Sequence, residues 1–176
     1  MASPSGGAAA PRDVLARTPF FADVLDDRQI DALAAGLRLA EFAKGSTLIR
    51  EDDLALSMFV LAHGEAAVTV PGKSGARRVA TLHAGDIFGE MSVLTGARRA
   101  ATITATTPVK AVEIPKIALS PLIAASPELA DRFAAMLAMR QGELDTIYRS
   151  DKSWRVSGLA GNDLAGLIRG FFAGAV

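Results

Sequence analysis

Residues 88–105 read Phe-Gly-Glu-Met-Ser-Val-Leu-Thr-Gly-Ala-Arg-Arg-Ala-Ala-Thr-Ile-Thr-Ala and hold the most informative pattern in the chain. Gly89 and Glu90 precede a short apolar turn, and Arg98 and Arg99 precede a strand of small residues. Arginine forms paired hydrogen bonds with phosphate oxygens, and an ionised carboxylate accepts hydrogen bonds from sugar hydroxyls. This order predicts a pocket for a small anionic ligand that carries hydroxyl groups.

The composition limits the classes of protein to consider. A chain of 176 residues, half of them hydrophobic, predicts one domain with appendages. The 19 basic residues balance the 19 acidic ones, which argues against a nucleic-acid partner because such proteins need a basic surface. The lack of cysteine excludes disulfides and thiol catalysis, and His63 and His83 lack the spacing of a metal site.

The chain also lacks the sequence signals of membrane insertion and secretion. No apolar stretch approaches the roughly 18–20 residues that a spanning helix needs. Residues 1–11 lack the basic and apolar regions of a signal peptide and predict a flexible tail. We expect a cytoplasmic location, either for a whole protein or for the cytoplasmic part of a membrane protein.

Apolar spacing divides the rest of the chain into zones. Residues 12–40 have helical spacing, and Asp26 or Asp27 is the expected cap of one helix. Residues 41–114 hold short apolar runs between turn residues, a pattern typical of a sandwich, barrel or jelly roll. The expected strands are residues 47–49, 58–61, 66–70, 79–82, 101–105 and 109–114. Helical spacing returns over residues 117–149.

The two ends of this last zone have different characters. Ser126, Pro127 and Glu128 predict a helix start, with a capping hydroxyl, a proline in the first turn and an acid beside it. Residues 150–176 predict a polar linker followed by a weakly amphipathic tail.

The residues around Glu90 suit an anion. Gly89 opens an expected helical turn containing Met91 and Ser92, and N–H groups at a helix start favour negative charge. Arg99 follows nine residues after Glu90 and can return to the same pocket across the turn at Gly96. The plainer alternative is an ordinary ion pair between Glu90 and Arg99.

The order Phe-Gly-Glu-Met-Ser, followed by Arg-Ala-Ala-Thr, resembles without a gap the phosphate-binding cassette of the cyclic nucleotide-binding domain family. The resemblance covers about residues 14–149 and includes leading helices near Phe20 and early strands at 45–49 and 57–61. Asp52 stands where the family commonly has a turn glycine, and aspartate tolerates the left-handed conformation better than most residues.

This resemblance implies a mixed α+β fold. It consists of a β-roll or jelly roll of about eight short antiparallel strands, flanked by N-terminal helices and closed by a C-terminal helix. It also implies roles: Glu90 accepts the ribose 2′-hydroxyl, and Arg99 binds the cyclic phosphate. Strand alternation places Arg98 on the opposite face, exposed to solvent. The cassette residues of the implied site are Gly89, Glu90, Met91, Ser92, Arg99, Ala100 and Ala101.

The implied ligand is cAMP, with cGMP as a weaker one, and no other cofactor. A hydroxyl residue directly after the phosphate arginine accompanies a cGMP preference in this family, and Ala100 has none. Gly89, Ala100 and Ala101 are expected to supply backbone donors or close approach. Val68 and Ala80 are expected to line the base, although strand residues of this type are also plain core.

Arg140 is the expected cover of the purine. It lies on the apolar stripe of the last helical zone, where an unpaired charge is costly. In one alternative, the aliphatic part of the Arg140 side chain packs against the protein and its guanidinium lies in water. The resemblance favours stacking on the base, because some members cap the base with an arginine there. Tyr148 is a second candidate.

Two functions of other classes compete with a non-catalytic sensor. A cupin-type metal enzyme also uses a jelly roll, but it needs more histidine ligands than this chain has. A ligand-free scaffold could keep the same fold, although the intact Glu90 and Arg99 argue against it.

The controlled partner is a separate question. About 28 residues follow Tyr148, too few for a helix-turn-helix. The pattern Ser-Pro-Glu-Leu-Ala with a following arginine resembles the C-terminal sensor domains of bacterial channels. We therefore expect a channel context, with oligomerisation through the parent protein. The alternative is a free-standing regulator of a partner protein.

Overall fold

The structure is a computed structural model that describes residues 9–147, with side chains described as far as Met139. Three helices come first: α1 (Pro11–Arg17), α2 (Pro19–Ala22) and α3 (Asp27–Ala34). The strands follow as β1 (Arg38–Phe42), β2 (Thr47–Ile49), β3 (Ser57–His63), β4 (Ala66–Gly72), β5 (Gly75–Leu82), β6 (Ile87–Phe88), β7 (Thr102–Ala105) and β8 (Val109–Pro115). Helix α4 (Glu90–Thr95) lies between β6 and β7, and α5 (Lys116–Ala125) and α6 (Pro127–Ile147) follow β8.

The strands form two four-stranded sheets in the orders β1-β8-β3-β6 and β2-β7-β4-β5, with every pairing antiparallel. One core cluster lies inside the roll that the two sheets enclose and includes Phe59, Leu61, Phe88 and Ile103. These features confirm the expected mixed α+β jelly roll.

Strand β3 explains how the roll joins the helices. Successive side chains of a strand point to opposite faces. Phe59 and Leu61 therefore pack inside the roll, while Met58 and Val60 pack in a second core with the helices. Because both faces are covered, the strand reads as a continuous apolar run rather than as an alternating one.

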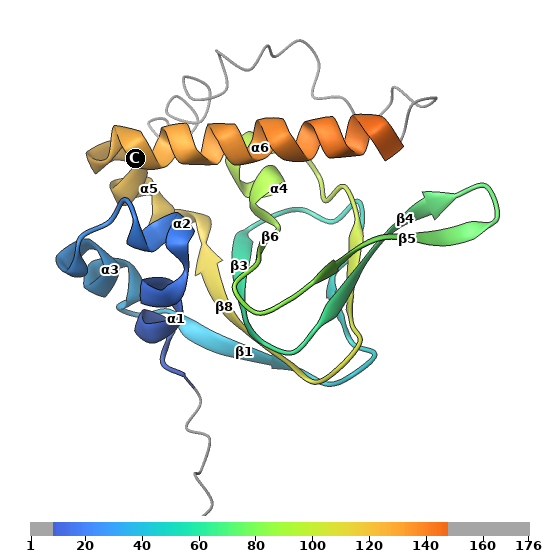
Figure 1. Cartoon of the computed structure of the whole chain (residues 1–176), viewed down its shortest axis with the longest axis horizontal. Coiled ribbons are helices and arrows are strands. Elements are labelled where there is room, and N and C mark those ends of the chain that lie inside the picture. The colour runs from blue at the N-terminus through green and yellow to red at the C-terminus, as the bar shows by residue number, and fades with distance from the viewer. Residues whose placement is uncertain (1–8, 148–176) are drawn as a thin grey trace, which may run out of the picture.

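The helices pack against one side of the roll, and α6 lies along its top edge (Figure 1). Asp26 is the cap of α3: its carboxylate accepts a hydrogen bond from the Gln29 N–H at 2.8 Å. The Gln29 side chain accepts one from the Asp26 N–H at 3.0 Å, which completes a capping box. Of the two caps expected, Asp26 is the one used.

The expected helical zone of residues 12–40 is wrong at its end. Helix α3 stops at Ala34, and Gly36 with φ 83° turns the chain into β1, which pairs with β8. Leu37 and Leu39 fit the predicted helical zone, but their spacing fits a strand equally well. The roll therefore begins at residue 38 rather than 41, and the two-residue strand β6 was also missed.

Several expectations fall outside the described residues. They are residues 1–8 of the flexible tail expected over residues 1–11, Tyr148, and the linker and tail of residues 150–176. The end of the expected tail is wrong, because α1 begins at Pro11. Between residues 9 and 147, no helix combines the length and apolarity that crossing a membrane requires.

The turn at Gly64 generates a stability prediction. Gly64 has φ 91°, and a Cβ there would overlap the Pro108 carbonyl oxygen and come within 2.9 Å of Thr107 Oγ1. Gly45 has a similar φ of 87° but open space around it. We expect Gly45→Ala to lower the free energy of unfolding by about 1 kcal/mol, and Gly64→Ala by about 2–4 kcal/mol. Urea denaturation measures both, and equal losses would contradict the close contact.

Candidate ligand-binding site

A cavity of about 720 Å³ lies between the roll and α6. Small-molecule sites in proteins usually have volumes of about 300–1,000 Å³. Nine of the ten residues predicted for the site line this cavity: Val68, Ala80, Gly89, Glu90, Met91, Ser92, Arg99, Ala100 and Ala101. The tenth, Arg140, belongs to α6, and its side chain lies outside the described part of the structure.

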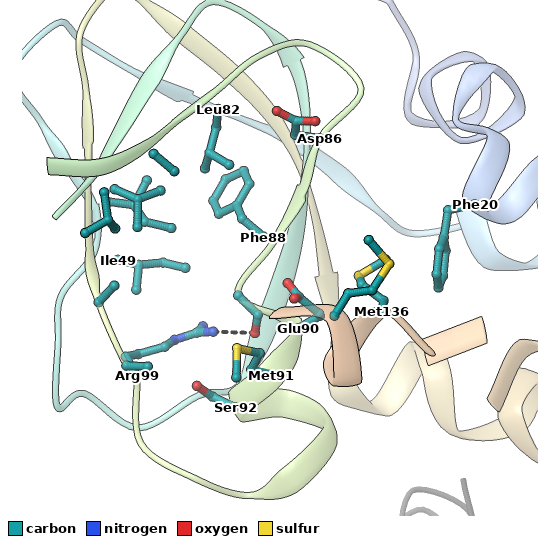
Figure 2. A pocket seen from close by; sticks show the side chains of 18 of the residues that line it. Phe20, Ile49, Leu82, Asp86, Phe88, Glu90, Met91, Ser92, Arg99 and Met136 are labelled. Carbon is teal, nitrogen blue, oxygen red and sulfur yellow. Dashed lines mark hydrogen bonds between the residues drawn. The ribbon is translucent and has the colours of Figure 1, made fainter. Parts of the chain in front are cut away.

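Arg99 is the most firmly held charged side chain at this cavity. It is 8% exposed, and its guanidinium bridges two backbone carbonyls. Nη1 donates to the Gly89 oxygen and Nη2 to the Ser57 oxygen, both at 2.6 Å. Figure 2 shows the first of these bonds beside the cavity. The sequence alternative of a plain ion pair with Glu90 thus omits the two backbone carbonyls that hold the guanidinium.

The backbone of Arg99 is fixed as well. Its N–H donates to the Asp53 oxygen at 3.0 Å, and its own oxygen accepts from the Asp52 N–H at 2.9 Å. Asp52 adopts φ 71°, as expected for the turn in which it replaces glycine. Arg98 is exposed, as predicted, and its Nη1 donates to the Asp52 oxygen at 2.8 Å.

The electrostatic setting of Arg99 favours an anionic ligand. Burial lowers the pKa of the Arg99 guanidinium from its usual value, while the negative charges of Glu90 and Asp53 raise it. Arginine remains protonated in proteins even under such a shift. The site therefore holds a partly desolvated cation, and a charge of this kind attracts an anion more strongly than an exposed one does.

Gly89 brings this cation close to α4. It is the N-cap of α4 and has φ 76°, in the left-handed region that glycine adopts easily. A Cβ on Gly89 would lie 2.7 Å from Arg99 Nη1 and 2.9 Å from Ile49 Cδ1. Glycine is therefore required both for the backbone conformation and for the space that Arg99 occupies.

The remaining cassette residues follow from this arrangement. Glu90 opens α4, is fully buried and lines the cavity. The Ser92 hydroxyl donates to the Arg98 carbonyl at 3.2 Å and so ties α4 to the arginine segment. The backbone N–H groups of Ala100 and Ala101 donate no hydrogen bond to any other residue in the described part of the chain.

The other walls of the cavity are mostly apolar and were largely missed by the sequence reasoning. Strands β2, β5 and β7 supply Ile49, Val79, Leu82 and Ile103, and α2 supplies Phe20. Their apolar character was visible in the sequence, but nothing in it separated cavity wall from ordinary core.

Helix α6 forms the cover through a face that the sequence did not single out. Arg132, Ala135, Met136 and Met139 line the cavity, and Figure 2 shows Met136 on the same side as Glu90. The adjacent face carries core residues such as Phe133. The helical spacing of the sequence merged these two faces into one apolar stripe.

The described residues contain no group of three or more histidine, aspartate or glutamate side chains placed to hold a metal ion. His63 lies exposed at the end of β3.

The family model for the cyclic nucleotide-binding domain matches residues 39–126, half of the chain. The chain belongs to the cyclic nucleotide-binding domain family. These matched residues include the whole cassette and all the strands except the first residue of β1. The matches indicate a binding and regulatory domain and point to no catalytic family.

Named relatives are regulators. The chain is 34% identical to a cAMP-dependent protein kinase regulatory subunit of Colletotrichum orbiculare over 112 residues, covering 63% of this chain and 28% of that protein. It is 28% identical to a CRP-like cAMP-activated global transcriptional regulator of Mycobacterium tuberculosis over 129 residues, covering 73% of this chain and 57% of that protein. The chain thus spans between about a quarter and somewhat over half of these relatives.

A solved structure supports the same fold. The N-terminal domain of a transcriptional regulator from Streptomyces coelicolor matches with a TM-score of 0.60 and 30% sequence identity. The match covers 76% of this chain and 96% of that one.

The two glycines that flank α4 give a matched test of the site. Gly89 and Gly96 share φ 76°, and a Cβ at Gly89 would in addition lie 2.7 Å from Arg99 Nη1. We expect both alanine variants to lose about 1–2 kcal/mol of stability. Gly89→Ala should also weaken cyclic nucleotide binding at least about tenfold, because it displaces the guanidinium. Isothermal titration measures this, and equal affinities of the two variants would contradict the arrangement.

Proposed function

We propose that this chain is a non-catalytic sensor domain for cAMP, whose binding moves α6. In the proposed complex Arg99 holds the cyclic phosphate, Glu90 holds the ribose and the adenine lies between β4, β5 and α6. The observation that carries the proposal is the buried, carbonyl-bridged guanidinium of Arg99 in the wall of the same cavity as the buried carboxylate of Glu90.

The phosphate end has unused donors. The two carbonyl bonds occupy two of the five guanidinium N–H groups, and the proposed complex uses the other three for the phosphate. The backbone N–H groups of Ala100 and Ala101 add to this set. A cyclic phosphate carries one negative charge and two free oxygens, which match a cation surrounded by N–H donors.

The ribose end needs an acceptor. An ionised carboxylate only accepts hydrogen bonds, and Glu90 lies at the start of α4 beside the residues that hold Arg99. The 2′-hydroxyl of cAMP is a donor that satisfies it. The charges also set the orientation of the ligand, because the Glu90 carboxylate would repel a phosphate placed beside it.

The base end favours adenine over guanine. Val68, Val79, Ala80 and Leu82 offer only apolar side chains there, and Ala100 lacks the hydroxyl that a guanine amino group would meet. A polar group buried without a partner costs about 1–3 kcal/mol. We therefore propose that cGMP binds in the same site but more weakly. Arg140 remains the proposed cap on the purine.

Helix α6 is the proposed output, and its contacts with α2 suggest a path. The ring centroids of Phe133 in α6 and Phe20 in α2 lie 4.7 Å apart, and Phe20 itself lines the cavity. Arg132 of α6 donates to the Pro19 carbonyl at 3.3 Å and approaches the Asp23 carboxylate at 3.5 Å. A shift of α6 over a bound ligand would therefore also shift the N-terminal helices.

The partner and location are part of the proposal. The relatives named above are a kinase regulatory subunit and a transcriptional regulator. The channel context predicted from the sequence has no counterpart among them, so a free-standing cytoplasmic regulator of a partner protein is an equal candidate. Oligomerisation would come through the parent protein in the channel case.

Isothermal titration tests the ligand and its anchor. We expect the wild-type chain to bind cAMP, and to bind cGMP more weakly. Arg99→Ala should reduce cAMP affinity by about tenfold to a hundredfold, because it removes charge-assisted hydrogen bonds to the phosphate. Arg98→Ala is the matched control, since it removes the same charge from an exposed neighbour. It should change affinity less than about threefold.

Two outcomes of this titration would overturn the proposal. One is the absence of binding heat with wild-type protein at millimolar cAMP. The other is an equal loss in the Arg98→Ala and Arg99→Ala variants, which would mean that only net charge matters.

Hydrogen exchange tests the output. Adding cAMP should slow amide exchange in α6 and also in α2, because Phe20 and Arg132 couple the two helices. Exchange at the β4–β5 turn, which projects from the right side of the roll in Figure 1, serves as the internal control. A change confined to the cassette, with α2 and α6 unaltered, would contradict transmission through these helices.

A further inference from the structure

The methionines of this chain gather at the ligand cavity. The sequence holds five, of which Met58, Met91, Met136 and Met139 belong to the described residues. Three of these four line the cavity, Met91 from α4 and Met136 and Met139 from α6. The fourth, Met58, is fully buried in the core of the helices and the roll. The thioethers therefore lie where the cassette helix and the covering helix face one another.

These thioethers differ in how easily a small oxidant reaches them. Met139 is 70% exposed, Met91 and Met136 are half-buried, and Met58 is 0% exposed. The whole chain contains no cysteine, so no thiol competes for an oxidant. Methionine is then the side chain that a peroxide oxidises most readily, and the order of reaction should follow exposure.

We propose that Met91, Met136 and Met139 form an oxidation-sensitive seam, and that their conversion to sulfoxides by a peroxide weakens cyclic nucleotide binding. This proposal rests on the proposed function of the cavity. In the reaction the sulfur lone pair attacks one peroxide oxygen and the O–O bond breaks. The oxygen is transferred to sulfur, which is oxidised by two electrons, and hydrogen peroxide is reduced to water.

The product has a different character from the thioether. A sulfoxide is a polar hydrogen-bond acceptor, whereas Met91 and Met136 pack against the apolar core of the helices. Closing α6 over a ligand would bury these oxygens among apolar side chains, where an unpaired polar group is unfavourable. The open form tolerates them in water, so oxidation opposes closure. A roughly tenfold loss of affinity is expected.

The same coupling acts in the other direction. If oxidation weakens ligand binding, a bound ligand must disfavour the oxidised protein to the same degree. A ligand in the cavity also shields the thioethers that line it. cAMP should therefore slow oxidation of Met91 and Met136 and leave Met58 as slow as before.

The test treats the full chain with hydrogen peroxide, with and without cAMP, and measures each methionine by peptide mass spectrometry. We expect sulfoxide to form first at Met139, then at Met136 and Met91, and last at Met58. After peroxide is removed, titration with cAMP should show the tenfold loss. Treatment with methionine sulfoxide reductase should restore the affinity, which separates sulfoxides from other damage.

A triple variant, Met91→Leu with Met136→Leu and Met139→Leu, is the matched control. Leucine keeps the volume of the side chain and cannot form a sulfoxide. Relative to its own untreated affinity, this variant should change less than about threefold after peroxide. The same tenfold loss in the triple variant would overturn the proposal, as would sulfoxides at Met91, Met136 and Met139 with no loss of affinity in the wild type.

Titration of the untreated protein with cAMP distinguishes a failure of the oxidation proposal from a failure of the proposed function. If it binds no cyclic nucleotide, the proposed function fails, and the oxidation proposal fails with it. If it binds cAMP and peroxide leaves the affinity unchanged, only the oxidation proposal is overturned.

Discussion

The guanidinium of Arg99 bridges two segments beside the cavity, which the pairing of β3 with β6 brings close together. Its two 2.6 Å bonds connect the Gly89 carbonyl, which precedes α4, with the Ser57 carbonyl, which begins β3. The Arg99 backbone adds the turn at Asp52 and Asp53 to the same assembly. A buried arginine is unfavourable unless its donors are satisfied, and these carbonyls satisfy it only in part. We propose that the remaining donors bind an anionic ligand.

This arrangement supports the proposal that a ligand in the cavity acts on distant helices. In the proposed complex the phosphate binds the guanidinium donors that the two carbonyls leave, and the ribose at Glu90 engages the first turn of α4. Helix α6 covers the same cavity and packs through Phe133 against Phe20 of α2. Binding can change the position of α6 only by the difference in ligand affinity between its positions. The methionines at this cover make that difference depend on the redox state of the surroundings.

Part of this structure was predictable from the sequence, and the reasons are physical. Six of the strands were located because turn residues separate their apolar runs, and the cassette was recognised because its glycine, carboxylate and arginine follow in a specific order. Strand β1 was not predicted because the spacing of Leu37 and Leu39 fits both a helix and a strand. The Ser57 carbonyl could not be foreseen as a partner of Arg99, because it is a backbone atom 42 residues away. The cavity face of α6 was missed because Met136 belongs to the same apolar stripe as the core residue Phe133.

The crystal structure of the chain with cAMP is the most direct test of the account. It should show the cyclic phosphate within hydrogen-bond distance of the Arg99 guanidinium and the N–H groups of Ala100 and Ala101, with the ribose 2′-hydroxyl on the Glu90 carboxylate. The carbonyls of Gly89 and Ser57 should still accept hydrogen bonds from the Arg99 guanidinium. A nucleotide bound elsewhere, or one in this cavity with its phosphate turned away from Arg99, would contradict the account.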